Sequence, residues 1–214
     1  MFRFKKYIVY SMVCGLVLAA CRKDEFKSLN EMIPADILDA ISEQIPLYEG
    51  DTPPMLEGSY VFSPCRILYS SFQSSLIDSL SDYHFKLSLQ NQEGKNSFIK
   101  FVGDNSIMRI DSCENACLVG KDQHFTAYFT VKGHHYTGVR YKAALILTGT
   151  KKEDGFIDCY LGIVLLDKSA NNSDTLLMPE GSFRIIEDGD TIVEKTDSTT
   201  STKCELKNCS LVEK

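Results

Sequence analysis

The chain has 214 residues, of which 43% are hydrophobic and 24% are charged, and it contains 13 Gly and 6 Pro. This composition is typical of a globular protein and excludes a disordered chain, which would have fewer apolar and more charged residues. The formal net charge is −6 and no basic stripe is visible, so nucleic acid is not an expected partner. Eight cysteines without an obvious metal-site spacing indicate an oxidising compartment, and the length predicts one main domain.

The first 20 residues have the features of a secretory signal peptide. Arg3, Lys5 and Lys6 are followed by the 14-residue apolar stretch 7–20, which contains only one Ser and one Gly. A helix needs about 20 apolar residues to span a bilayer, so this stretch is too short for a membrane span. We therefore expect residues 1–20 to be a signal peptide that is removed.

The stretch Leu18-Ala19-Ala20-Cys21 resembles the lipobox of bacterial lipoproteins. The resemblance implies cleavage before Cys21 and attachment of a lipid, palmitate included, to Cys21, so that the membrane is one partner. The alternative is that Cys21 merely follows an ordinary signal peptide. Without residues 1–20 the chain keeps 20 basic and 29 acidic residues, so the lipid and not a basic face would hold the membrane.

Residues 21–29 are expected to be a tether between the lipid and the folded part. The run Arg22-Lys23-Asp24-Glu25-Phe26 resembles the signal that exports Bacteroidetes-type lipoproteins to the outer face of the outer membrane. Those signals are dominated by acidic residues, whereas this run begins with two basic ones, and a plain solvated tether is the alternative. Arg22 also departs from the acidic residue of the inner-membrane retention pattern. The predicted location is the cell envelope, at the outer membrane, with the face left open.

Residues 30–46 are expected to form one N-terminal helix. The stretch Asn30–Ile45 carries a single apolar stripe, made of Ile33, Ile37, Leu38, Ile41 and Ile45. Pro34 fits an early helical position and Pro46 stops the helix. This helix should pack across the end or the side of the main domain.

Residues 47–195 read as a succession of short strands with turns between them. Strict alternation at 84–90 and 124–132, and in-phase apolar residues along 136–150 and 156–166, indicate strands with one apolar face. Further strands are expected at 59–63 and 66–71, taken as a first pair, and at 97–102, 106–110, 182–186 and 191–194. Turns are expected at 103–105 and 132–135, and residues 196–214 read as a polar C-terminal tail.

Many short antiparallel strands predict a mainly β fold, either a barrel or a sandwich. An up-and-down order of about eight to ten strands with one N-terminal helix resembles a calycin-type barrel, the class of the lipocalins and avidins. Tyr48-Glu49-Gly50, Pro53-Pro54, 57–60 and 147–150 also resemble recurring stretches of uncharacterised Bacteroidetes-type surface lipoproteins. Neither resemblance implies an activity, because a fold does not determine a function. A β-sandwich remains the alternative.

Six cysteines remain when Cys14 and Cys21 are set aside. Cys113 and Cys117 bracket a three-residue segment, and Cys204 and Cys209 bracket a four-residue segment, so each pair is a candidate for a local disulfide. A zinc site built from these four residues is a weaker alternative, because its two halves are far apart in sequence. Cys65 and Cys159 are expected to be buried free thiols.

The sequence contains no nucleophile elbow, no Gly-rich phosphate loop and no His-Glu-x-x-His motif, so we expect a protein that is not an enzyme. No catalytic residue, no metal site and no cofactor is predicted. His134-His135 is the most chelator-like pair, but a solvated turn is the preferred interpretation.

The predicted function is binding of a small apolar or amphipathic ligand inside the barrel. The candidate lining residues share the apolar phase of their strands: Phe85, Leu87, Phe125, Phe129, Tyr141, Leu145 and Leu161. The same residues would equally fill the barrel as a core. The alternative function is therefore a structural or adhesion subunit with a filled barrel that binds another envelope protein.

Overall fold

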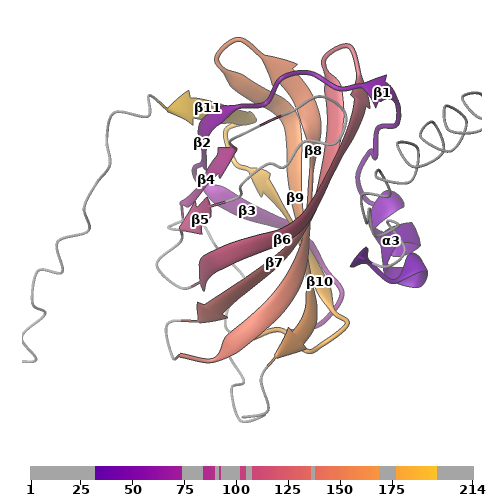
Figure 1. Ribbon diagram of the computed structural model, residues 1–214, viewed down its shortest axis with the longest axis vertical. Helices are drawn as coiled ribbons and strands as arrows, with labels where there is room; N and C mark the ends of the chain where they lie inside the picture. Colours follow the sequence, from indigo (N-terminus) through magenta and orange to yellow (C-terminus); the bar gives the residue numbers. More distant parts are fainter. Residues whose placement is uncertain are drawn as a thin grey trace, which may run out of the picture.

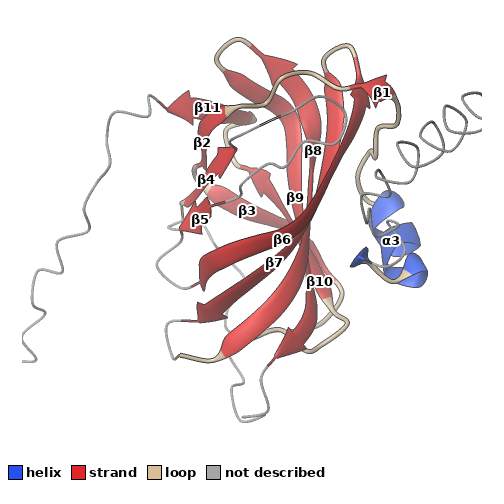
Figure 2. Ribbon diagram, viewed as in Figure 1, coloured by secondary structure: helices blue, strands red, loops and turns tan. Residues whose placement is uncertain are grey.

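A computed structural model describes residues 32–73, 84–89, 92, 102–104, 108–135, 138–168 and 177–196 of the protein. The fold is mainly β, as expected, with one α-helix among these residues, α3 (Ala35–Ser42) (Figures 1 and 2). The strands are β1 (Asp51–Thr52), β2 (Gly58–Phe62), β3 (Cys65–Ser70), β4 (Phe85–Leu89), β5 (Val102–Asp104), β6 (Met108–Lys121), β7 (His124–His135), β8 (Arg140–Lys152), β9 (Gly155–Lys168), β10 (Phe183–Asp188) and β11 (Ile192–Thr196).

The strands form one strongly curved sheet with the order β11-β2-β4-β5-β6-β7-β8-β9-β10-β3 (Figure 1). Neighbours along this path are antiparallel, and the short β1 lies parallel to β6. The recorded pairings do not join the two end strands, β11 and β3, to each other, so the path is open. A second pairing connects β11 to β9, where Val193 lies opposite Phe156.

The expected pairing of the first two strands is wrong. β2 pairs with β4 and β11, whereas β3 pairs with β10 at the other end of the path. The chain between them is held by the β10–β11 turn: the Ser63 N–H donates to Asp188 Oδ2 at 2.8 Å, and the Gly189 N–H donates to the Pro64 carbonyl at 2.8 Å. The up-and-down order is therefore interrupted at β3.

The strand expected at 106–110 is only the start of the long β6, and β7 is also longer than expected. β6 has register shifts between Ile110 and Ser112 and again between Cys113 and Asn115. Each shift breaks the alternation of apolar and polar residues, so the period-2 signal disappears from the sequence. β7 continues to His135, and Gly133 pairs with strands on both sides, so the turn expected at 132–135 is wrong.

The curved sheet has an apolar cluster on each face. The inner cluster fills the concave side and comprises Leu56, Tyr60, Phe62, Cys65, Phe85, Leu87, Leu89, Leu118, Phe125, Ala127, Phe129, Val131, Tyr141, Ala143, Leu145, Leu147, Phe156, Cys159, Leu161, Leu165, Leu177, Met178, Ile186 and Val193. The outer cluster lies under α3 and comprises Met32, Ile33, Ile41, Ile45, Tyr128, Ala144, Ile146, Val164, Phe183 and Ile185. Strict alternation along β7 and β8 supplies both clusters from the same strands. On β9 the phase changes between Phe156 and Cys159, both of which belong to the inner cluster, where the β8–β9 register shifts.

The helix packs on the side of the sheet, as Figure 1 shows, and its apolar stripe was correctly predicted. It is shorter than expected: Pro34 is its N-cap, with an extended ψ of 137°, and not an early helical residue. After the helix, the Thr148 hydroxyl donates to the Pro46 carbonyl at 2.8 Å and the Tyr48 N–H donates to Thr126 Oγ1 at 2.7 Å. These bonds hold the segment between helix and strands against the outer face.

Within the described part of the chain, no helix combines the length and the apolar character needed to cross a membrane.

Candidate ligand-binding site

The structure brings all seven predicted lining residues together in the inner cluster, where each is at most 6% exposed. They do not all have the same role. Phe85, Tyr141 and Leu145 line a cavity. Leu87, Phe125, Phe129 and Leu161 are packed among other side chains of the cluster and do not line the cavity. The interior therefore combines a core with a small hollow, and both interpretations of these residues apply to different parts of it.

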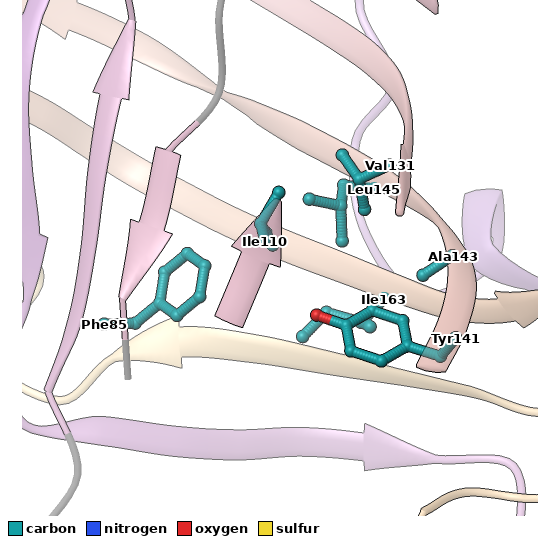
Figure 3. A pocket seen from close by; sticks show the side chains of 7 residues that line it. All are labelled: Phe85, Ile110, Val131, Tyr141, Ala143, Leu145 and Ile163. Carbon is teal, nitrogen blue, oxygen red and sulfur yellow. The ribbon is translucent and has the colours of Figure 1, made fainter. Parts of the chain in front are cut away.

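The cavity has a volume of about 20 Å³, which is room for one or two water-sized groups. Its walls come from five strands, β4, β6, β7, β8 and β9, and consist of Phe85, Ile110, Val131, Tyr141, Ala143, Leu145 and Ile163 (Figure 3). Apart from the Tyr141 hydroxyl, which points among the other side chains in Figure 3, these side chains are apolar. Such a hollow suits a short alkyl group rather than a polar one.

Four wall residues, Ile110, Val131, Ala143 and Ile163, were not among the predicted lining residues. The alternation of apolar residues indicated the face of three of them, because Val131, Ala143 and Ile163 are in phase with predicted lining residues on the same strands. Alternation assigns a residue to a face, but it does not say at which height along the strand the packing is incomplete. The cavity could therefore not be located from sequence.

The other end of the interior is filled by aromatic rings. Tyr60 stacks on Phe156 with ring centroids 4.0 Å apart, and Phe125 lies 5.0 Å from Phe156. The Tyr60 hydroxyl donates to the Leu56 carbonyl at 2.9 Å, and burial raises the pKa of Tyr60 to about 12. We call this region the packed half, defined by Leu56, Tyr60, Phe125, Phe156 and Val193.

The region around the cavity is the cavity half, defined by the seven wall residues. Phe125 and Val131 are six positions apart on β7, and Phe156 and Ile163 are seven apart on β9. At about 3.3 Å per residue, roughly 20 Å of strand separates the two halves. The two halves therefore occupy opposite ends of the interior.

One charged side chain of the inner face lies beside the cavity half. Arg184 of β10 is directly opposite the wall residue Ile163 and is only 9% exposed. Its guanidinium carbon lies 4.5 Å from the centre of the Phe72 ring. The buried Nε–H has no hydrogen-bond partner, and burial lowers the pKa of the guanidinium from its ordinary value. Arginine nevertheless keeps its charge in proteins, so the group is a buried cation.

A second charged residue on the inner face, Asp188, stabilises a turn through its hydrogen bonds. Its Oδ2 accepts the Ser63 N–H and its Oδ1 accepts the Asp190 N–H at 3.1 Å, which fixes the β10–β11 turn. Burial raises the pKa of Asp188 to about 6. The carboxylate also raises the pKa of the nearby Cys65 and Cys159 thiols, in addition to the larger effect of burial.

The cysteines correct one expectation and confirm another. Cys113 and Cys117 form no disulfide, and they belong to opposite faces: Cys113 packs on the inner cluster and Cys117 on the outer cluster. A local bridge between them is therefore not formed, because the bulged strand β6 directs the two side chains apart. Cys65 and Cys159 are buried free thiols, as predicted.

His134 and His135 lie on the last two positions of β7 and not in a turn. Neighbouring residues of a strand face opposite sides, so the pair does not form one chelating site. Within the described residues, no group of three or more His, Cys, Asp and Glu side chains is arranged to hold a metal ion.

Several predictions fall outside the described residues: the signal peptide 1–20, Cys21 with its lipid, the tether 21–29, Cys204 and Cys209, and the tail beyond Thr196. They stay predictions.

The comparisons with known proteins add no relative to this picture: no family model, no curated protein and no solved structure matches the chain.

Proposed function

We propose that the protein is a lipid-anchored outer-membrane lipoprotein that binds a small ligand inside a calycin-like barrel. The barrel is supported by the double pairing of β11, which joins β2 on one side and β9 on the other and so brings distant parts of the sheet into contact. The lipid anchor rests on the Leu18-Ala19-Ala20-Cys21 stretch. No chemical step is part of this function.

The observation that carries ligand binding is an apolar cavity at one end of the interior. Seven side chains from five strands surround it, while stacked aromatic rings occupy the packed half. Ligand sites are typically apolar hollows with a few polar groups, and they occur at the mouths of barrels. The small volume limits the group that enters without rearrangement to one or two heavy atoms.

The test is the mass of the processed protein, purified from its native envelope and measured under native and then denaturing conditions. Ligand binding predicts an excess mass that disappears on denaturation. Ala143→Leu would fill the cavity and remove this excess, whereas Ala35→Leu, on the exposed start of α3, would keep it. A mass accounted for by chain and lipid alone in all three proteins would contradict ligand binding.

The lipid anchor is tested separately by growing cells with labelled palmitate. Cys21→Ser should lose the label, and Cys14→Ser, inside the predicted signal peptide, should keep it. Label retained by Cys21→Ser would contradict the anchor without bearing on the cavity.

One observation favours a second candidate, an interaction subunit of an envelope complex. The end strand β3 carries two large apolar side chains that are exposed, Leu68 at 44% and Tyr69 at 36%. Exposed apolar residues on an end strand can pair with another chain. Loss of a co-purifying envelope protein from Leu68→Lys, with the ligand mass unchanged or absent, would support this candidate.

A further inference from the structure

We infer that the ligand is a small amphipathic anion, whose oxyanion head is bound by Arg184 and whose short apolar part enters the cavity. This inference rests on the proposed ligand-binding function and names the chemistry of the ligand. The head is an oxyanion, either a carboxylate or a phosphate monoester, because each of these groups presents two oxygens to one guanidinium.

The first step is the direction of the Arg184 side chain. On β10, Phe183 and Ile185 belong to the outer cluster and Ile186 belongs to the inner cluster. Arg184 is opposite Ile163, and the β9–β10 register is regular from Phe183 to Glu187. Residues directly opposite each other in an antiparallel pair share a face, with Cβ atoms about 5 Å apart. Arg184 therefore starts on the inner face, next to a wall of the cavity.

The second step is the state of its guanidinium. The side chain is more than nine-tenths buried, yet its Nε–H donates to nothing. Among the described residues, Arg66 forms an ion pair with Glu187, whereas Arg184 has no acidic partner. Buried charges in proteins are normally paired, because an unpaired one loses its hydration without compensation. An unpaired arginine on the inner face is therefore a feature that a bound anion would explain.

The third step is the contact with Phe72, which does not replace an anion. The guanidinium carbon lies 4.5 Å from the centre of the Phe72 ring, and the backbone carbonyl of Phe72 accepts a hydrogen bond from the Ser70 hydroxyl at 2.8 Å. A ring face attracts the cation but accepts none of the in-plane N–H donors in the way an oxygen does. The Nε–H, which has no partner, marks the edge of the guanidinium at which an oxyanion would bind.

The fourth step is the size of the apolar part. The cavity of about 20 Å³ accommodates a short alkyl group, and its walls are almost entirely apolar. A long chain would need the wall residues to move. Anchoring of the head at Arg184 and entry of the tail beside Ile163 thus define a ligand with a charged head and a short tail.

The test compares butyrate, butyl phosphate and the neutral butanol, each titrated into the full chain in detergent micelles at constant ionic strength. Binding is followed by saturation-transfer NMR, with empty micelles as the blank. We expect at least one of the two anions to bind about tenfold or more tightly than butanol. The anion that binds more tightly shows whether the head of the ligand is a carboxylate or a phosphate. Arg184→Met should reduce this preference to less than twofold, and Arg184→Lys should retain part of it.

The matched control is Arg66→Met, which removes an exposed arginine from the adjacent strand and should leave the preference unchanged. An anion preference that persists in Arg184→Met, or is lost equally in Arg66→Met, would overturn the inference. Equal binding of butanol and the anions at a site blocked by Ala143→Leu would also overturn it, but would leave the proposed ligand-binding function standing. Binding of none of the three compounds would overturn both.

Discussion

The two ends of the interior are built from the same strands but packed differently. In the packed half, the Phe156 ring of β9 lies against both the Tyr60 ring of β2 and the Phe125 ring of β7. In the cavity half, the same strands β7 and β9 contribute aliphatic residues, Val131 and Ile163, and β8 contributes the small Ala143. On β7 one uninterrupted alternation directs both Phe125 and Val131 inward, at opposite ends of the interior. The difference shows that side-chain size at one level of the strands decides whether the interior is a core or a site.

The largest effect is expected from removing a ring of the packed half. Phe156→Ala deletes a side chain that is fully buried between Tyr60 and Phe125, and it should lower the free energy of unfolding by about 3–5 kcal/mol. Ile110→Ala, at the wall of the cavity and only partly buried, should cost less, because the space beside it is already empty. Denaturant unfolding of both variants measures the difference, and equal losses would contradict the division into two halves.

The next effect concerns the contact of β11 with β9 in the packed half. Gly155 has φ +152°, and a Cβ at this position would lie 2.1 Å from the Val193 carbonyl oxygen. Gly155→Ala should therefore lower the free energy of unfolding by about 1–3 kcal/mol and increase hydrogen exchange at Val193 and Glu194. Gly181→Ala is the control, because its φ is also positive, +75°, but no atom lies within 4 Å. An equal effect of both variants would attribute the loss to the backbone angle and not to the contact.

Enlarging an alanine should distinguish the two halves directly. Ala127 is fully buried on β7, between Phe125 and Phe129 in sequence, so Ala127→Leu should overpack the core and cost about 1–3 kcal/mol. Ala143→Leu enters the cavity and should cost less than about 1 kcal/mol. Thermal unfolding of the two variants checks this order. A reversed order would mean that the hollow is not at Ala143.

The smallest effect is a pH dependence from Asp188. Its pKa is about 6 in the folded protein, against an ordinary value of 3.8, so the folded state binds more protons than the unfolded state between about pH 4 and pH 6. The free energy of unfolding contributed by this group should therefore fall as the pH rises through that window, and stay level above it. The pKa of the neighbouring Asp190 is lowered, so its own titration lies below the window.

Asp188→Asn should remove that slope, and denaturant unfolding at pH 4, 5, 6 and 7 measures it. The comparison is between the slopes of the two proteins, because the substitution also changes the bonds to Ser63 and Asp190. Parallel curves for the two proteins would show that Asp188 does not titrate in this range.

The sequence predicted the parts of the fold that depend on local periodicity. The stripe of Ile33, Ile37 and Ile41 identified the helix and its buried face. The strict alternation of Phe125, Ala127 and Phe129 identified their common face. These predictions succeed because a helix of period 3.6 and a strand of period 2 each place their apolar residues on one side.

Prediction failed where the chain departs from a regular period or where partners are distant in sequence. The bulges of β6 hid most of a 14-residue strand, of which only the start was expected, and the close spacing of Cys113 and Cys117 suggested a local disulfide. The pairing of β3 with β10 joins Cys65 to Asp188, which are more than a hundred residues apart, and no local signal favours it over the adjacent β2. Long-range pairing depends on how the whole sheet curves, which local residues do not specify.

The sequence by itself determined that the protein is mainly β, that one helix covers it, and which residues of the regular strands face inward. Only the tertiary structure decided that Phe156 lies against both Tyr60 and Phe125, that Ala143 and Ile163 border a cavity, and that Arg184 starts beside it with no acidic partner among the described residues. The physical reason is that alternation assigns a side chain to a face, whereas a cavity and an unpaired charge depend on which side chains several distant strands bring to the same level.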